Sequence, residues 1–493
     1  MTTASVAARW SDETDWRGKI FSGTWREGSA GTIDVIDKSS GAVLGSLGVA
    51  SVADVAAAAQ AASRAQPGWA ATPVADRVAI LQRARDLLEA HADEFAWWLV
   101  RESGSTLPKA QFEISFTIGK FDKIIDDARN ATFEEVIVDD GSYRSVAARV
   151  PLGVVGVIGP FNFPLYLNLR AVLPALAFGN TVVLKPDEQT AVAAGILVAK
   201  LFAEAGLPPN VLHVLPGDVD PGKALVADPN VAMIAFTGSS VVGKQIGAVA
   251  GGMLKRVSLE LGGNSPFIVL ADADIEAAAS CGAWGSFLHQ GQICMASSRH
   301  LVHESIADAY AKALTEHANK LLVGDPATSQ VHLGPLINEQ QLQRVERIVN
   351  ETAAKGAKIT TGGTHEDRFY RPTVITGVTP GMAAFDEEIF GPVAPITTFK
   401  TDDEAVELAN RTEYGLSASV HSRSLEHARG VARRLRTGMV HINDQTVNDD
   451  PRIPFGGVGD SGNGSRQGGH AALDEYTTWR WETERVEPPP YPF

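Results

Sequence analysis

The chain of 493 residues is too long for a single hydrophobic core and predicts two or three domains. Its net charge of −15 argues against nucleic acid or an anionic membrane as a partner, because both bind clustered Lys and Arg. Two cysteines exclude a disulfide framework and favour a reducing, cytoplasmic location, and the lack of ~18 consecutive uncharged apolar residues argues against a membrane span.

The first third of the chain is expected to form edge strands and helices. Alternating apolar and polar residues over 17–48 predict short strands, and helical periodicity predicts helices over 52–63, 76–102 and 108–128. Residues 132–150 are typical of a hairpin around an acidic turn, and we expect this hairpin to be an exposed arm.

Residues 152–259 alternate apolar strands with helices. Strands are expected at 152–159, 181–184, 211–215, 232–236 and 256–259, with helices over 165–178 and 190–205. This alternation predicts an α/β fold with a doubly wound parallel sheet, which binds ligands at the carboxyl ends of its strands. Residues 266–442 show the same alternation of strands and helices and predict a second α/β unit. An extended tail is expected at the C-terminal end.

Cys294 lies in a polar, glycine-containing turn at 290–299, between a predicted helix over 277–288 and a predicted strand over 300–303. A thiolate at such a junction is accessible to a substrate and gains acidity near backbone N–H groups. The alternative is an inert core thiol, because free cysteine is often buried. The other cysteine, Cys281, lies in a run of small residues that predicts a buried helix.

Polar residues follow the first two strands of the predicted sheet. Asn162, held between two aromatic residues and two prolines, could donate its amide to a developing oxyanion or could be an ordinary turn residue. Lys185 and Glu188 could hold the hydroxyls of a ribose, and Glu188 would repel a 2′-phosphate, which favours NAD over NADP. In isolation, a solvated charged loop also explains this pair.

Later strand ends offer further candidates. Gly238 and Ser239 open a helix where backbone N–H groups suit a pyrophosphate, although the GxGxxG fingerprint is absent. Glu260 closes the fifth strand beside an apolar residue and two glycines, which suits a general base, although a glutamate at a strand end is often solvated. Glu388 could serve a second ribose, and Phe390 could flank a nicotinamide.

Taken in this order, the motifs resemble those of the aldehyde dehydrogenase superfamily over nearly the whole chain. The matching segments are Phe161-Asn162-Phe163-Pro164, Lys185-Pro186-Asp187-Glu188, Phe236-Thr237-Gly238-Ser239, Glu260-Leu261-Gly262-Gly263, Gly291-Gln292-Ile293-Cys294, Glu388-Ile389-Phe390-Gly391-Pro392 and Pro454-Phe455-Gly456-Gly457. Finer details at 289–295, 455–464 and 491–493 resemble bacterial benzaldehyde and vanillin dehydrogenases.

The resemblance implies a role for each candidate. Cys294 would be the nucleophile, Glu260 the general base, and Asn162 the oxyanion donor together with the Cys294 N–H. The cofactor would be NAD rather than NADP, and no metal is expected. The residues implied to bind the cofactor are Ile158, Pro160, Phe161, Lys185, Glu188, Gly217, Phe236, Gly238, Ser239, Val242, Leu261, Glu388 and Phe390. Those implied to wall the substrate pocket are Phe163, Leu167, Arg170, Trp284, Ile293, Met295 and Phe455.

One of these residues departs from the pattern of the superfamily. Many members that act on aliphatic aldehydes often place a tryptophan where this chain has Arg170. The arginine could contact a substituent on an aromatic ring, or it could make a structural ion pair.

The resemblance also implies the division of the chain. We expect an NAD-binding domain at 1–131 and 152–258, a second α/β catalytic domain at 259–447, and a small β oligomerisation arm with the C-terminal tail at 132–151 and 448–493. Such an arm implies a homodimer or homotetramer.

The expected activity is NAD-dependent oxidation of an aromatic aldehyde to the carboxylic acid, through a thiohemiacetal and a thioester on Cys294. One alternative is an aldehyde dehydrogenase for aliphatic aldehydes or semialdehydes. A CoA-acylating enzyme is another, against which Glu260 argues. A cysteine-dependent hydrolase without redox chemistry is a different class, as is a binding protein on a retired scaffold, against which Asn162, Glu260 and Cys294 argue.

Overall fold

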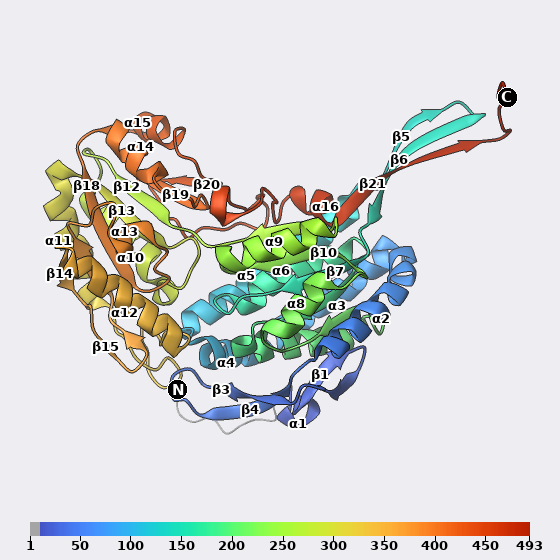
Figure 1. Cartoon of the computed structure of the whole chain (residues 1–493), viewed down its shortest axis with the longest axis horizontal. Coiled ribbons are helices and arrows are strands. Elements are labelled where there is room, and N and C mark those ends of the chain that lie inside the picture. The colour runs from blue at the N-terminus through green and yellow to red at the C-terminus, as the bar shows by residue number, and fades with distance from the viewer. Residues whose placement is uncertain (1–9) are drawn as a thin grey trace.

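Two seven-stranded sheets, each packed against helices, form the two halves of the molecule (Figure 1). The computed structural model describes residues 10–493, and residues 1–9, where the expected NAD-binding domain begins, lie outside this range. Within residues 10–493, no helix is both long enough and apolar enough to cross a membrane.

The first sheet is parallel except at one edge. Its strands, in spatial order, are β11 (Arg256–Glu260), β10 (Val231–Thr237), β7 (Val154–Ile158), β8 (Thr181–Lys185), β9 (Leu212–Val214), β1 (Lys19–Ser22) and β2 (Trp25–Glu27). β1 and β2 are the antiparallel edge strands expected near the N-terminus. The chain runs from β7 to one side and later returns to the other, so the order reverses between β7 and β10. Such a reversal opens a ligand-binding crevice at the carboxyl ends of these strands.

The apolar runs predicted as strands are buried because helices cover the sheet. The helices of this half are α1 (Glu13–Trp16), α2 (Val52–Ala71), α3 (Val74–Ala90), α4 (Ala92–Ser103), α5 (Leu107–Asn130), α6 (Pro164–Ala177), α7 (Leu197–Glu204), α8 (Val219–Ala227) and α9 (Ser240–Gly252). A separate hairpin, β3 (Thr32–Ile36) and β4 (Val43–Gly48), accounts for the rest of the predicted N-terminal strands.

Two predicted helices were wrong in detail. The segment 76–102 is not one helix, because the backbone breaks at His91 (φ −110°, ψ 19°) between α3 and α4. The segment 190–205 begins with a π-helical turn, Val192–Ile196, before α7. The buried carboxylate of Glu102 accepts hydrogen bonds from the N–H groups of Val192 and Ala193, and so caps this irregular start.

The second sheet has one antiparallel edge strand. Its strands are β14 (Lys358–Thr361), β17 (Thr373–Thr376), β18 (Val393–Phe399), β13 (Ser297–His303), β12 (Ser265–Val269), β19 (Ser417–His421) and β20 (Met439–Ile442). The main helices of this half are α10 (Ile275–Phe287), α11 (Ala307–Lys320), α12 (Glu339–Ala354), α13 (Ala383–Asp386), α14 (Asp402–Asn410) and α15 (Leu425–Ala432). A small hairpin, β15 (His365–Glu366) and β16 (Phe369–Tyr370), completes it.

The predicted hairpin at 132–150 is an arm that projects from the first half (Figure 1). β5 (Glu134–Asp139) and β6 (Tyr143–Pro151) form it, and the C-terminal strand β21 (Thr477–Arg485), which follows α16 (Ala471–Tyr476), pairs with β6 along its whole length. The tail is therefore an integral strand of the arm. Val136, Ile137 and Trp481 are exposed on this arm.

Candidate active site

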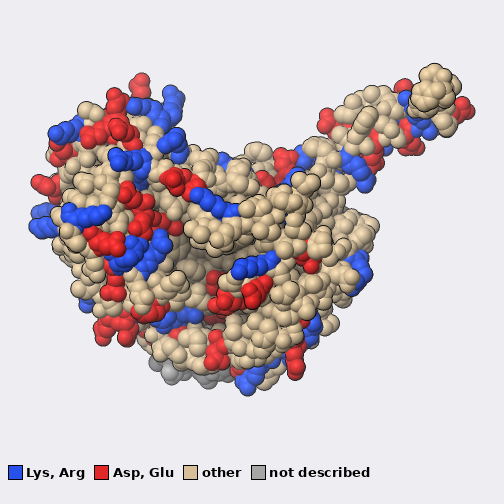
Figure 2. Space-filling view, viewed as in Figure 1, with Lys and Arg blue, Asp and Glu red and all other residues tan. Residues whose placement is uncertain are grey.

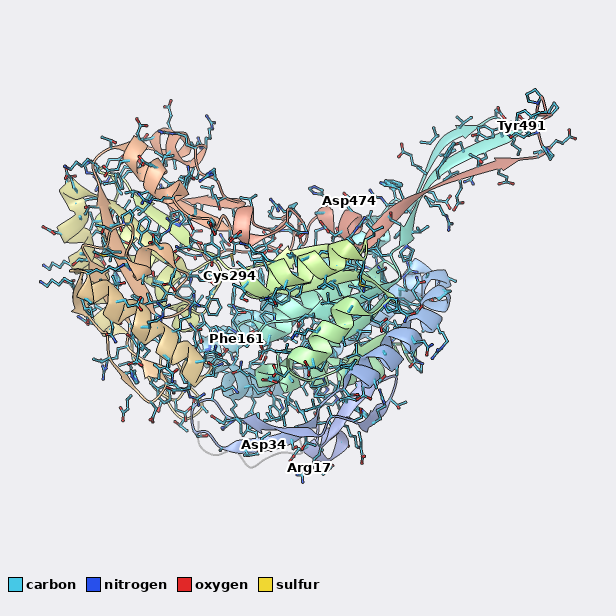
Figure 3. All side chains as sticks on the ribbon, viewed as in Figure 1. Arg17, Asp34, Phe161, Cys294, Asp474 and Tyr491 are labelled. Atoms are coloured by element: carbon cyan, nitrogen blue, oxygen red, sulfur yellow. The ribbon has the colours of Figure 1, made fainter. Side chains whose placement is uncertain are left out.

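A cavity of about 750 Å³ lies between the two halves, where Figure 2 shows the surface hollowed. Its lining runs from Lys185, at the carboxyl end of β8, past Ser239, at the start of α9, to Cys294. Phe161 and Cys294 mark the boundary between the halves in Figure 3. The volume is in the range of small-molecule and cofactor sites, which is ~300–1,000 Å³.

All the residues expected to bind the cofactor line this cavity except Glu188 and Gly217. Glu188 is partly buried, and burial and the nearby Asp218 carboxylate raise the pKa of its carboxyl group. The lining also contains residues that were not predicted, among them the charged residues Asp218 and Arg344. Asp218 follows the third strand of the sheet, so its place at a strand end was a signal, whereas Arg344 comes from α12 in the other half and has no local signal.

The turn before α9 fits the phosphates of a dinucleotide. The Oγ of Ser239 accepts a hydrogen bond from the Val242 N–H at 3.4 Å, and the two residues line the cavity with Gly238. A Cβ at Gly238 would lie 2.5 Å from the ring of Phe236, so glycine leaves the room this turn needs. The first N–H groups of a 13-residue helix therefore adjoin the cavity, and Lys185 adds a positive charge to it.

The turn that carries Cys294 joins α10 to β13, as predicted. His289 and Gln290 both have left-handed backbone angles, with φ of 49° and 56°. The turn is held in place because the Gln290 side chain donates to the carbonyls of Gly104 and Pro335. Cys294 is partly exposed and lines the cavity, unlike a thiol enclosed in the core. Cys281 is partly exposed on α10 rather than buried.

Gly262 and Gly263 bring the end of β11 against the Cys294 turn. A Cβ at Gly263 would overlap the carbonyl oxygen of Cys294, and one at Gly262 would lie 2.6 Å from a carboxylate oxygen of Glu388. The Gly263 N–H donates to that same carboxylate at 2.8 Å. Two consecutive glycines therefore let Glu260, Cys294 and Glu388 approach one another.

Glu260 is buried at the end of β11, and neither carboxylate oxygen has a hydrogen-bond partner among residues 10–493. Burial raises the pKa of this carboxyl group to about 8, and the Arg170 guanidinium opposes that rise. The ionised form of a carboxyl with such a pKa can take a proton from a thiol or a water, and this form predominates only above about pH 8.

The Cys294 thiol is hard to ionise in this site. Burial raises its pKa to about 12, the Arg170 guanidinium opposes the rise, and the nearby carboxylates of Glu388 and Glu260 add to it. Formation of a Cys294 thiolate near neutral pH therefore needs a nearby base.

Asn162 is buried and, like Cys294, lines the cavity. Its Nδ2 donates to the carbonyl of Gln292 at 2.9 Å, which fixes the amide in one orientation. A second N–H on the same nitrogen is available to an oxyanion.

An apolar cluster adjoins the thiol. Ile293, Met295, Leu416 and Phe455 are buried together, and Phe163 and Cys294 pack against them. Leu167 lines the large cavity. Trp284, by contrast, is 56% exposed on α10 and belongs neither to this cluster nor to the cavity lining within the described residues.

Arg170 makes an ion pair, one of the two roles considered for it. Its Nη1 lies 3.7 Å from Oδ2 of Asp449, and its side chain is only 3% exposed. The guanidinium also lies over the ring of Phe455, 4.5 Å from the centroid. The Tyr166 hydroxyl donates to the same Asp449 carboxylate at 3.0 Å.

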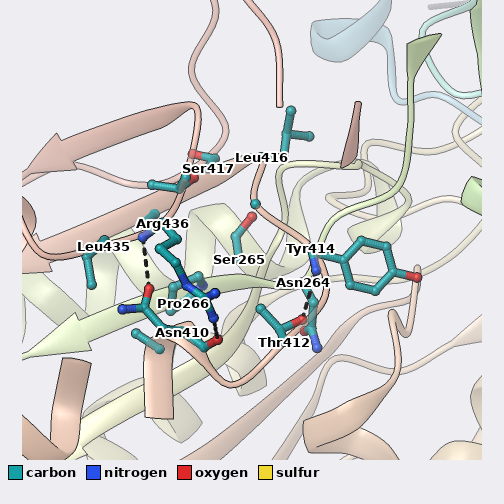
Figure 4. A pocket seen from close by; sticks show the side chains of 14 residues that line it. Asn264, Ser265, Pro266, Asn410, Thr412, Tyr414, Leu416, Ser417, Leu435 and Arg436 are labelled. Carbon is teal, nitrogen blue, oxygen red and sulfur yellow. Dashed lines mark hydrogen bonds between the residues drawn. The ribbon is translucent and has the colours of Figure 1, made fainter. Parts of the chain in front are cut away.

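A second hollow, beside Asn264 and Tyr414, measures only about 10 Å³ (Figure 4). Arg436 bridges it with hydrogen bonds to both the side chain and the carbonyl of Asn410. This space is too small for a substrate.

Comparisons with known proteins agree with this geometry. The sequence profile of the aldehyde dehydrogenase family matches residues 25–481. The chain is 51% identical over 480 residues to a benzaldehyde dehydrogenase [NAD(+)] of Pseudomonas putida, covering 97% of this chain and 98% of that protein. It is 50% identical over 483 residues to a vanillin dehydrogenase of Amycolatopsis sp., covering 98% and 99%.

A solved structure of similar fold is the NAD-dependent aldehyde dehydrogenase of Sinorhizobium meliloti. It matches with a TM-score of 0.92 and 38% identity, over 97% of this chain and 96% of that one. The chain therefore belongs to the aldehyde dehydrogenase family, and it is an oxidoreductase that acts on small aldehydes with a nicotinamide cofactor.

Proposed function

We propose that this enzyme oxidises aromatic aldehydes of the benzaldehyde or vanillin type to carboxylic acids with NAD⁺. The observation that carries the proposal is the apolar cluster of Ile293, Met295, Phe455 and Phe163 packed beside the Cys294 thiol. Its two aromatic rings suit a planar apolar substrate. The similarity to a benzaldehyde and a vanillin dehydrogenase, at about half the residues over nearly the full length, supports the same substrate class.

The first step makes the thiohemiacetal. Glu260 takes the proton of the Cys294 thiol, the sulfur bonds to the aldehyde carbon, and the carbonyl electrons move to the oxygen. The free N–H of Asn162 Nδ2 and the Cys294 N–H stabilise that oxyanion. A nicotinamide bound in the cavity supplies the acceptor for the hydride that the same carbon loses.

The second step releases the acid. Glu260 first releases the thiol proton to solvent and then takes a proton from water, and the resulting hydroxide adds to the thioester carbon. The carbon–sulfur bond breaks, the carboxylic acid leaves, and the departing thiolate takes the proton back from Glu260 to regenerate Cys294. The carboxylate oxygens of Glu260 have no hydrogen-bond partner within residues 10–493, which supports this role because both can accept a proton.

We further propose that NAD is preferred over NADP. Asp187 and Asp218 line the cavity with Lys185, and both carboxylates lie near enough to raise the pKa of the Glu188 carboxyl group. These negative charges would repel a 2′-phosphate.

The two sheets support the expected domain limits, with the cofactor-binding domain at 1–131 and 152–258 and the catalytic domain at 259–447. The exposed apolar residues of the arm support assembly into a homodimer or homotetramer. A cytoplasmic location remains a prediction from the two cysteines.

The experiment is a panel of benzaldehyde, vanillin, hydroxybenzaldehydes and short aliphatic aldehydes, each with NAD⁺ and NADP⁺, compared by kcat/KM. We expect the highest values with aromatic aldehydes and NAD⁺. Cys294→Ala should abolish oxidation and keep NAD⁺ binding. Higher kcat/KM for aliphatic aldehydes or semialdehydes would contradict the substrate assignment. Dependence on CoA would favour a CoA-acylating enzyme. Ester cleavage without NADH formation would favour a cysteine-dependent hydrolase.

A further inference from the structure

A fully buried ion pair on α5 lies behind the Asn162 segment. Nζ of Lys109 is 2.6 Å from Oε2 of Glu113, and the two side chains are 1% and 0% exposed. Neither residue lines the large cavity. A buried pair is weak evidence for stability, because well-packed apolar residues of similar volume often stabilise a fold as well or better.

The contacts of Lys109 link the ion pair to the backbone of Asn162. Its Nζ donates to the backbone carbonyl of Asn162 at 2.7 Å and lies 4.0 Å from the centroid of the Phe163 ring. With the Glu113 carboxylate, these contacts surround the ammonium group. Because the Asn162 side chain also donates to the Gln292 carbonyl, the residue is held at both its backbone and its amide.

Glu113 fixes the other end of the same segment. Its second carboxylate oxygen accepts hydrogen bonds from the N–H groups of Leu165 and Tyr166 at 2.9 and 3.1 Å. These are the first N–H groups of α6, and its N-cap residue, Phe163, makes no side-chain cap. A single carboxylate therefore caps α6 and orients Lys109 toward Asn162.

We propose that Lys109 is a positioning residue, which with Glu113 fixes the Asn162 amide where the oxyanion forms. The inference rests on the proposed role of Asn162. Preorganisation of a donor matters because the stabilisation it gives falls steeply with misplacement, and a shift of ~1 Å can cost about 10²-fold in rate. Removing Lys109 frees the Asn162 carbonyl and lets the segment move.

The test is a cycle of three variants: Lys109→Met, Asn162→Ala and the double variant. Asn162→Ala should lower kcat/KM about 10²- to 10³-fold, the effect of losing one oxyanion donor. Lys109→Met should lower kcat/KM about 10- to 100-fold in the wild-type background, with the Kd for NAD⁺ unchanged. In the Asn162→Ala background, Lys109→Met should change kcat/KM less than about 3-fold, because the donor it positions is gone.

The control is Lys123→Met, which removes the lysine of a second pair on α5, with Asp127, that is partly exposed. It should leave kcat/KM unchanged. Should Lys109→Met fail to fold, as judged by circular dichroism, Lys109→Met with Glu113→Gln removes both charges and carries the same comparison.

Three outcomes overturn the inference. Wild-type kcat/KM in the folded Lys109 variant would show that Lys109 does not position the donor. Equal losses in the two backgrounds would show a general structural role. Wild-type kcat/KM in Asn162→Ala would instead refute the role proposed for Asn162 itself, and so separates that failure from the other two.

Discussion

Gly263 lies against the backbone carbonyl of Cys294 so closely that any side chain at Gly263 would overlap the carbonyl oxygen. The end of β11 and the turn that carries Cys294 come from different halves of the molecule. The contact between these two residues therefore sets how the carboxylate on one half faces the sulfur on the other.

We predict that Gly263→Ala displaces the Cys294 turn. The clash is with backbone, which cannot rotate away, so we expect about 1–3 kcal/mol of lost stability. A shift of the sulfur by ~1 Å should lower kcat about 10²-fold. Gly68→Ala is the matched control, because a Cβ there meets nothing within 4 Å and α2 favours alanine. Wild-type kcat in Gly263→Ala would show that the contact is not constraining.

The rate of acid release should depend on pH through Glu260. Burial raises the pKa of its carboxyl group to about 8, and only the ionised form accepts a proton. Below that pH the group is protonated and inactive as a base, so kcat should rise with pH and level off above about 8. Glu260→Gln should abolish this rise and lower kcat by about 10²- to 10⁴-fold. A rise centred near the ordinary glutamate pKa, or one retained in Glu260→Gln, would contradict the assignment.

Arg170→Met separates the two roles considered for this arginine. Removing Arg170 leaves the buried Asp449 carboxylate with Lys120 and the Tyr166 hydroxyl as its remaining support, and we expect a loss of up to about 3 kcal/mol in urea denaturation. Arg170→Met with Asp449→Asn should recover part of that loss. If the role is structural, the ratio of kcat/KM for 4-hydroxybenzaldehyde over benzaldehyde stays unchanged in the folded double variant. A changed ratio would assign Arg170 to the ring substituent.

Assembly should depend on the arm. Trp481 is 75% exposed and anchored by a hydrogen bond from its Nε1 to Ser145 at 2.9 Å. A charge at this position would oppose burial in a subunit interface, so Trp481→Glu should give a smaller species in light scattering. Leu254→Glu, at an exposed apolar residue on the body, should leave the mass unchanged. An unchanged mass in Trp481→Glu would place the interface elsewhere.

Features set by a short stretch of sequence were predictable. The apolar run of β7 and the polar residues at the carboxyl ends of β7, β8 and β11 located the crevice, because parallel strands bring their ends to one edge. Features set by distant contacts were not. Lys109 reaches Asn162 from 53 positions away along the chain, and no local pattern in α5 indicates that contact.

The irregular start of the helix predicted over 190–205 also depends on a distant contact. The irregular turn at Val192–Ile196 forms around the Glu102 side chain, which lies 90 positions earlier and which helical periodicity does not report. The expectation that Trp284 forms a wall of the substrate pocket came from resemblance alone. Its side chain is largely exposed to solvent.

The last strand of the chain, β21, forms one edge of the arm and runs outward from the body, and Tyr491 lies at the far tip of the arm, away from both halves (Figure 3). A fluorescent protein fused after Phe493 would therefore lie far from the large cavity. Energy transfer between two differently coloured fusions could then follow subunit exchange in real time, while turnover is recorded in the same cuvette.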